Sequence, residues 1–216
     1  MTITGMILKM SEGLGRTCSI FFLTVLFSLP LGLVATFGRM SSNGLIRNIT
    51  KLYISVMRGT PLMLQLFVVF YAPFYLFKIP LSSEWRFIAC IVAFVINYAA
   101  YFAEIFRAGI ESIPKGQYEA AHVLGYSKGQ TFFKIILPQM VKRVLPPVTN
   151  EMITLVKDTS LAFSINIMEM FTTAKEIASG QKNIMALVAA GVFYFVFNFL
   201  VAAVMERVEK KLAYYR

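Results

Sequence analysis

Charged residues and histidine are scarce in this sequence. Charged residues make up 15% of the 216 positions, against about 25% in an average soluble domain. The one histidine, His122, argues against a histidine-based metal site or catalytic triad, and no cofactor is expected. Cys18 and Cys90 fall at or inside apolar runs, which argues against a structural disulfide. The sequence also lacks a GxxxxGK[ST] phosphate-binding loop, so nothing in it points to ATP binding by that loop.

The sequence contains several long apolar runs without charged residues. Apolar residues make up 57% of the chain. Four charge-free runs reach the roughly 17 residues that a helix needs as a minimum to cross the bilayer core. These runs cover 17–38, 59–77, 87–103 and 183–205. A further span over 150–168 is also apolar, apart from Glu151, Lys157 and Asp158.

We therefore predict an all-α integral membrane protein, a single domain over 1–216 with a helical cytoplasmic loop over 112–143. The five predicted transmembrane helices cover about 17–38, 59–77, 87–106, 150–168 and 183–205. With five spans, 14 lysines and arginines lie on one side and 6 on the other, with Lys157 inside a span, whereas four spans divide them 13 to 8. Because cytoplasmic loops carry the excess of positive charge, the N-terminus is expected outside and the C-terminus in the cytoplasm. The basic side then faces the anionic lipid headgroups of the inner leaflet.

The longest polar segment has the pattern of two short helices joined by a turn. Residues 117–124 have a helix-forming composition, and Glu119 is expected near the positive N-terminal end of this helix. Gly125 stands where a helix C-terminal cap takes a left-handed residue. Ser127 and Gln130 have the spacing of a capping box that begins a second helix.

Two interpretations of this helix pair compete. Small alanines, a turn glycine and a capped second helix are also typical of a DNA-binding helix-turn-helix, which would make the chain a membrane-anchored regulator. The middle of the second helix, however, carries Phe132 and Phe133 where a recognition helix needs polar side chains for base edges. An apolar face of this kind favours a protein groove, and no nucleic-acid partner is expected. Pro138 is expected to end the second helix, and Pro146 and Pro147 to break the chain before the fourth span.

Polar residues also occur inside the predicted spans, where burying a charge is costly. Asn97, Tyr101 and Glu104 are spaced i, i+4, i+7 and share one helix face, which would line the interior of a bundle. Alternatively, Lys157 and Asp158 only anchor their helix in the cytoplasmic half of the membrane. An intramembrane hydrolase with a Glu104–Asp158 dyad is disfavoured, because the two carboxylates differ in depth by roughly 12 Å. The residues expected to bound a polar substrate pathway are Asn97, Tyr98, Tyr101, Glu104, Asp158, Thr159, Ser160 and Leu161.

Several motifs resemble one known family. Glu119-Ala120-Ala121, Gly125 and the Leu137-Pro138 pair resemble the "EAA" loop of permease subunits in binding-protein-dependent ABC importers. The resemblance is to the polar amino acid branch (histidine-, glutamine- and arginine-type permeases) and covers about half of the chain, from 53 to 163. Ala108 departs from it, since a glycine is expected there. The further matching stretches are RGTPLMLQL (58–66), YAAYFAEIFRAGIESIPKGQYEAAHVLG (98–125) and KDTSL (157–161).

The resemblance implies a type I ABC importer permease fold in a bacterial inner membrane. It implies a coupling helix docked on a separate cytoplasmic ATP-binding subunit, which hydrolyses the ATP, so this chain is not itself an enzyme. A second permease chain and an extracytoplasmic amino-acid-binding protein are the other expected partners. The residues expected at the coupling contact are Glu119, Ala120, His122, Leu124 and Gly125, together with Ala121.

Two further expectations concern a sequence motif and the substrate. In the motif Arg58-Gly59-Thr60-Pro61, Thr60 is expected to cap a helix whose first turn tolerates Pro61, and Arg58 to have a structural role. Carboxylates at membrane depth, not matched by as many arginines there, favour a cationic amino acid such as arginine, lysine or histidine as the substrate.

Overall fold

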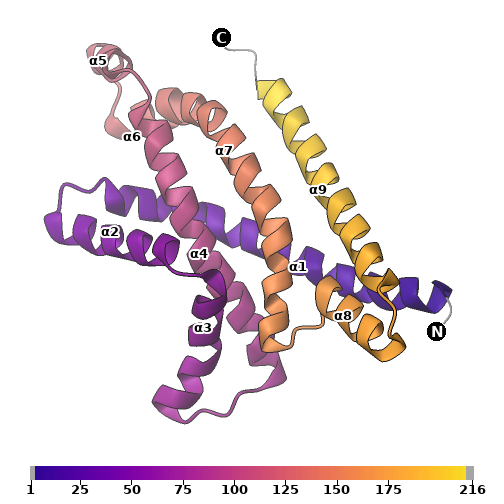
Figure 1. The fold of residues 1–216 in the computed structure, drawn as a ribbon. Coiled ribbons are helices and arrows are strands. Elements are labelled where there is room, and N and C mark those ends of the chain that lie inside the picture. Colours follow the sequence, from indigo (N-terminus) through magenta and orange to yellow (C-terminus); the bar gives the residue numbers. More distant parts are fainter. Residues whose placement is uncertain (1–2, 213–216) are drawn as a thin grey trace.

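The computed structural model describes residues 3–212, which form helices joined by short turns, with no strand in this range (Figure 1). The elements are α1 (Ile3–Arg39), α2 (Gly44–Gly59), α3 (Leu62–Phe77), α4 (Ser83–Glu111), α5 (Lys115–Val123), α6 (Lys128–Thr131), the π-helix η1 (Phe132–Ile136), α7 (Leu137–Asp158), the 3₁₀ helix η2 (Thr159–Ile165), α8 (Met170–Gln181) and α9 (Met185–Leu212). The all-α class is confirmed.

Helix α4 lies at the centre of the bundle and is crossed closely by α1. A Cβ atom added to Gly32 of α1 would lie 2.8 Å from Cβ of Phe102 and 3.1 Å from the carbonyl oxygen of Ala99. One turn further on, the Thr36 hydroxyl donates a hydrogen bond to the carbonyl oxygen of Ala103 over 3.1 Å. Small residues let helices approach closely in a membrane, where apolar burial does not drive helices together. The α1–α4 crossing therefore depends on glycine and alanine.

The second predicted span, 59–77, begins before the helix that it predicts, because α3 begins at Leu62. The chain bends by 112° between α2, which ends at Gly59, and α3, which begins at Leu62 (Figure 1). Pro61 occupies the N-cap position of α3, and no side chain caps that helix. The Thr60 hydroxyl instead donates to the carbonyl oxygen of Val56, in the last turn of α2. The predicted capping of α3 by Thr60 is therefore wrong. Helix α3 alone, at about 24 Å, is shorter than the bilayer core of about 30 Å.

The fourth span also differs from the prediction. Helix α7 ends at Asp158, and the chain continues as a 3₁₀ helix where the span 150–168 was expected. The predicted breaks at Pro138, Pro146 and Pro147 do not occur: Pro138 occupies the first turn of α7, where proline is tolerated, and the other two lie inside the helix. The π-turn of η1 carries α6 directly into α7. The expected second short helix is therefore the beginning of a longer helical segment that runs to the end of α7.

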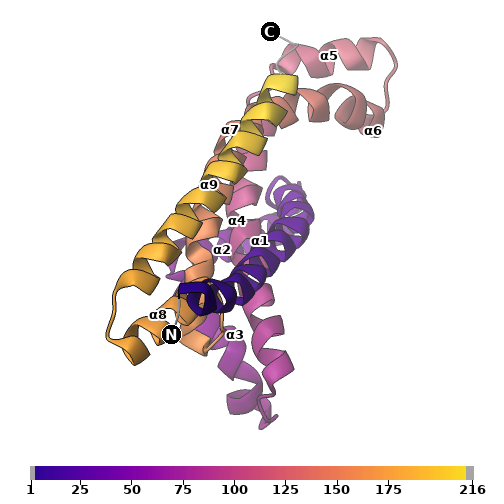
Figure 2. The ribbon, with the colours of Figure 1, turned by 90° about the vertical axis from the view of Figure 1, so that its right-hand side faces the viewer.

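Three helices within residues 3–212 are long and apolar enough to cross a membrane: α1 from Ile7, α4 and α9. The bent pair α2–α3 adds a fourth if it forms one span, and the five-span count stays a prediction. Helix α8 was not predicted. Helices α5 and α6 and the C-terminal end of α9 lie at one end of the molecule, and α8 and the α3–α4 turn lie at the other (Figures 1 and 2).

Candidate functional site

A groove of about 530 Å³ opens between α2, α4 and α7. Its polar lining consists of Arg58, Tyr101, Glu104, Arg107, Ser112, Arg143 and Glu151. Arg58 comes from the last turn of α2, immediately before the bend, and Glu151 from the middle of α7. The groove thus depends on three segments that are distant in the sequence, and it combines positive and negative side chains.

The charges of the groove fall into two groups. Glu104 accepts hydrogen bonds from Arg107, with Nη2 at 2.6 Å and Nε at 3.2 Å from Oε2. Its other oxygen lies 3.8 Å from Nε of Arg39, so the charge of Glu104 is neutralised within the protein. The Arg58 guanidinium lies over the ring of Tyr101, 5.3 Å from the ring centroid. Within residues 3–212 Arg58, Arg143 and Glu151 form no ion pair. Arg143 donates to the carbonyl oxygen of Ser112, which leaves Arg58 and Glu151 as the charged side chains available to a ligand.

The structure separates the predicted pathway residues. Tyr101 and Glu104 line the groove, but Asn97 is only 4% exposed and donates to the carbonyl oxygen of Met57 over 3.0 Å. The spacing of Asn97, Tyr101 and Glu104 places them on one face of α4, as predicted. Spacing alone does not tell which helix covers that face, and α2 and α3 cover it at Asn97.

Asp158 and its neighbours form a second polar group outside the groove. The Tyr98 hydroxyl donates to Oδ2 of Asp158 over 2.7 Å, which joins the centre of α4 to the end of α7. In the turn that follows, Thr159 is buried and its hydroxyl donates to the carbonyl oxygen of Val156. Ser160 and Leu161 of η2 are half-buried. Lys157 is exposed, whereas Asp158 is half-buried.

Three polar residues with prominent positions were missed by the sequence prediction. Gln65 is 8% exposed at the α2–α3 bend, and Glu151 lines the groove. Glu169, which precedes α8, is completely buried. For Gln65 a signal existed, since it is the one amide in an otherwise apolar run and such residues are costly in a membrane.

The predicted turn between the two short helices is confirmed. Gly125 has φ of +76°, and its N–H donates to the carbonyl oxygen of His122 over 3.0 Å. The capping box of Ser127 and Gln130 is present with both of its hydrogen bonds. Glu119, however, lies in the second turn of α5, because this helix begins at Lys115 and not at residue 117, so the expected dipole contact is absent.

The predicted coupling face needs one further correction. Ala121 is 1% exposed and packs inside the chain, so it cannot contact a partner as expected. Glu119, Ala120, His122, Leu124 and Gly125 are exposed. Val123, which was not predicted, is 86% exposed, and Leu124 is 72% exposed. The accessible face of α5 thus ends in two apolar side chains.

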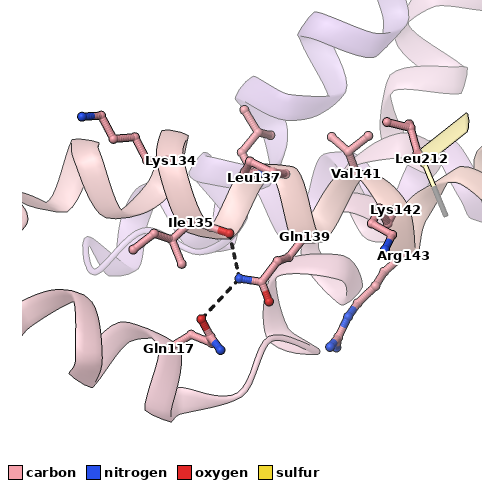
Figure 3. Close-up of a pocket in the computed structure, with 10 residues that line it drawn as sticks. Gln117, Lys134, Ile135, Leu137, Gln139, Val141, Lys142, Arg143 and Leu212 are labelled. Atoms are coloured by element: carbon pink, nitrogen blue, oxygen red, sulfur yellow. Dashed lines mark hydrogen bonds between the residues drawn. The ribbon is translucent and has the colours of Figure 1, made fainter. Parts of the chain in front are cut away.

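A second cavity, of about 880 Å³, separates α5 from α7 and the end of α9 (Figure 3). The side-chain amide of Gln139 donates to the carbonyl oxygen of Ile135 over 2.9 Å and to Oε1 of Gln117 over 3.4 Å, which links the two sides (Figure 3). Helix α5 is therefore attached to α7 by few contacts and projects from the bundle.

Comparison with known proteins gives the same assignment from sequence and from structure. Residues 28–214 match the family model of the binding-protein-dependent transport system inner membrane component. The chain is 37% identical over 210 residues to the L-cystine transport system permease protein TcyB of Bacillus subtilis (strain 168), which covers 95% of this chain and 87% of that protein. It is 35% identical over 202 residues to the arginine transport system permease protein ArtQ of the same organism, with 93% and 91% covered.

The structural comparison extends over the whole bundle. The crystal structure of an amino acid ABC transporter with histidines superimposes with a TM-score of 0.86 and 29% identity, covering 98% of this chain and 100% of that chain. The type I importer permease fold is thereby confirmed. The chain belongs to the family of binding-protein-dependent transport system inner membrane components, and it is a permease subunit of an amino acid ABC importer and not itself an enzyme.

Proposed function

We propose that the transported amino acid passes along the groove between α2, α4 and α7. The observation that carries this proposal is the pair of charged side chains in the groove, Arg58 and Glu151, that lack an ion-pair partner within residues 3–212. An α-amino acid is a zwitterion, so its carboxylate suits Arg58 and its ammonium group suits Glu151. Charge-assisted hydrogen bonds of this kind are about twice as strong as neutral ones.

The finer part of the proposal is a preference for cationic amino acids, namely arginine, lysine or histidine. The support for it is that the groove contains two carboxylates, Glu104 and Glu151, of which Glu151 forms no ion pair within residues 3–212. The relatives described above are named for cystine and for arginine, so these substrates are the ones to compare.

The proposal extends to the partner proteins and to the orientation of the chain in the membrane. Helix α5 docks on the ATP-binding subunit through Glu119, Ala120, His122, Leu124 and Gly125, and the binding protein delivers its amino acid at the opposite end, near α8. A second permease chain, identical or related, completes the pathway. Lysines and arginines at the α5 end support a cytoplasmic position for that end and for the C-terminus in a bacterial inner membrane, with the N-terminus outside.

The test is substrate-stimulated ATP hydrolysis and uptake in proteoliposomes that contain this chain, its ATP-binding subunit and the binding protein. Arginine, glutamine, glutamate and cystine are added in turn, and stimulation by arginine above the others supports the cationic preference. Glu151→Gln is expected to lower uptake about tenfold or more, since one charge-assisted hydrogen bond is lost. The matched control is Glu84→Gln, at the exposed far end of α4. Equal uptake by both variants contradicts the groove as the pathway.

A further inference from the structure

The bend between α2 and α3 creates a problem of unsatisfied backbone groups. The last carbonyl groups of a helix have no partner within that helix, and Pro61 has no N–H with which to continue the pattern. A bend at membrane depth is tolerated only where other groups of the protein satisfy these carbonyls. The α2–α3 bend therefore requires donors from elsewhere.

Two side-chain amides supply those donors. Nε2 of Gln65 donates to the carbonyl oxygens of Met57, over 2.9 Å, and Thr60, over 3.1 Å, and approaches the Thr60 hydroxyl at 2.8 Å. Nδ2 of Asn97 donates to the same Met57 oxygen over 3.0 Å and to Oε1 of Gln65 over 2.9 Å. Carbonyl oxygens only accept, so the atoms that face Met57 must be the amide nitrogens, and the orientation of both amides follows.

These contacts are shielded from the surroundings. Gln65 and Asn97 are 8% and 4% exposed. On one side lies a buried apolar cluster in which Ile54 of α2 packs against small residues of α4. The Tyr53 hydroxyl donates to the carbonyl oxygen of Ile96 over 2.5 Å and gives a second link between the same helices. In such surroundings a lost amide donor cannot be replaced by water without opening the packing.

We propose that Gln65 and Asn97 form an amide clasp, a pair of positioning residues that fix the α2–α3 bend and hold Arg58 at the groove. The clasp joins Met57 of α2 to Asn97 of α4. One residue later on α2 and one turn later on α4, Arg58 lies over Tyr101. The same two helices thus carry the clasp and the groove contact, and a change at the first displaces the second. The part that concerns Arg58 rests on the proposed role of the groove.

The clasp is tested by measuring the bend directly. Spin labels are attached at Lys51→Cys in α2 and Phe77→Cys at the end of α3, both exposed, in a Cys18→Ala, Cys90→Ala background. The full assembly is reconstituted with an excess of unlabelled chain that carries the same substitution as the labelled chain, and the distance distribution is measured by pulsed electron resonance. The variants are Gln65→Met, which keeps the length of the side chain, and Asn97→Leu, which keeps its size. Asn198→Leu in α9 is the matched control, an amide away from the bend.

We expect one narrow distance in the parent and in Asn198→Leu. In Gln65→Met and in Asn97→Leu, the fraction of molecules at other distances should rise about tenfold, as expected for the loss of one or two net hydrogen bonds. Uptake is measured on the same samples. A changed distance with reduced uptake supports both the clasp and the position of Arg58. A changed distance with normal uptake supports the clasp and overturns the groove as the pathway. An unchanged distance in both variants overturns the clasp, whatever the uptake.

Discussion

Helix α5 and the segment that precedes α8 each contain a side chain in the environment opposite to the one it prefers. At the end of α5, which lies outside the apolar runs, Val123 is 86% exposed, and Leu124, the residue that follows the helix, is 72% exposed. Before α8, Glu169 is completely buried between apolar helices. The two segments lie at opposite ends of the molecule (Figures 1 and 2).

The two cases differ in whether the chain itself compensates. Oε1 of Glu169 accepts from the N–H and the hydroxyl of Thr172, over 2.7 and 2.9 Å. Oε2 accepts from the N–H of Phe171 over 2.7 Å and from the hydroxyl of Tyr194 over 2.9 Å. The buried carboxylate is thus fully hydrogen-bonded and ties α8 to α9. Val123 and Leu124 are adjacent, and no segment within residues 3–212 covers them, so both side chains are accessible to the ATP-binding subunit that we propose to dock here.

The largest effect is expected from Glu169→Leu. The substitution leaves the N–H groups of Phe171 and Thr172 and the hydroxyl of Tyr194 without their acceptor in a buried place. Each such loss costs about 1–3 kcal/mol, so we expect a destabilisation of at least about 3 kcal/mol. In a chain of this length that corresponds to a fall of roughly 6–12 °C in the unfolding midpoint. Circular dichroism of the purified assembly on heating measures it.

Glu176→Gln, on the exposed face of α8, is the control for this change. A surface substitution of this kind is expected to stay within about 0.5 kcal/mol of the parent. If both variants unfold at the same temperature, the buried hydrogen bonds of Glu169 do not hold this end of the molecule together, and the proposed contrast with α5 is lost.

The opposite result is expected for the double variant Val123→Ser, Leu124→Ser. Since both side chains are exposed, the unfolding temperature of the permease should not fall. Burial of such a side chain in an interface contributes about 1.5–3 kcal/mol, so the affinity for the ATP-binding subunit should fall by at least about tenfold. Binding of the purified subunit to the permease in lipid nanodiscs measures this. Ile79→Ser, an exposed apolar residue at the other end, should bind normally. Equal binding by the double variant and the parent would remove α5 from the interface.

Local chemistry explains which parts of the fold could be predicted from sequence. The apolar runs 17–38 and 183–205 became α1 and α9, because length and apolarity alone determine such helices. Gly125 and the Ser127–Gln130 box were predicted correctly, because a cap depends on a few adjacent residues. The chain break predicted at Pro146 and Pro147 was wrong, because whether a proline breaks a helix depends on what surrounds the carbonyl groups that lose their N–H partner. In this structure α7 continues through both prolines.

The candidate site was predictable only in part for a related reason. Tyr101 and Glu104 were identified, because polar residues on one face of a membrane helix indicate an interior surface. Asn97 shares that face, yet the bend of α2–α3 covers it, and the bend depends on contacts between residues 32 and 40 positions apart in the sequence. Glu151 reaches the groove only because α7 packs beside α4. Spacing along one helix carries no information on such neighbours.

The smallest effect is expected at Gly125, which lies in the turn between α5 and α6 and sets the angle between them. This angle determines how α5 presents Val123 and Leu124. The φ of +76° at Gly125 costs a residue with a side chain about 1–2 kcal/mol, so Gly125→Ala should change the angle between α5 and α6. The unfolding temperature should hardly change, because this segment projects from the bundle, whereas substrate-stimulated ATP hydrolysis should fall a few-fold. Gly129→Ala is the matched control, since a Cβ there meets open space within α6 and alanine favours helix. Equal hydrolysis by both variants would show that the contact does not depend on the direction of α5. A loss in Gly125→Ala alone would show that the exposed apolar pair acts through its orientation, in the way that the buried Glu169 acts through its hydrogen bonds.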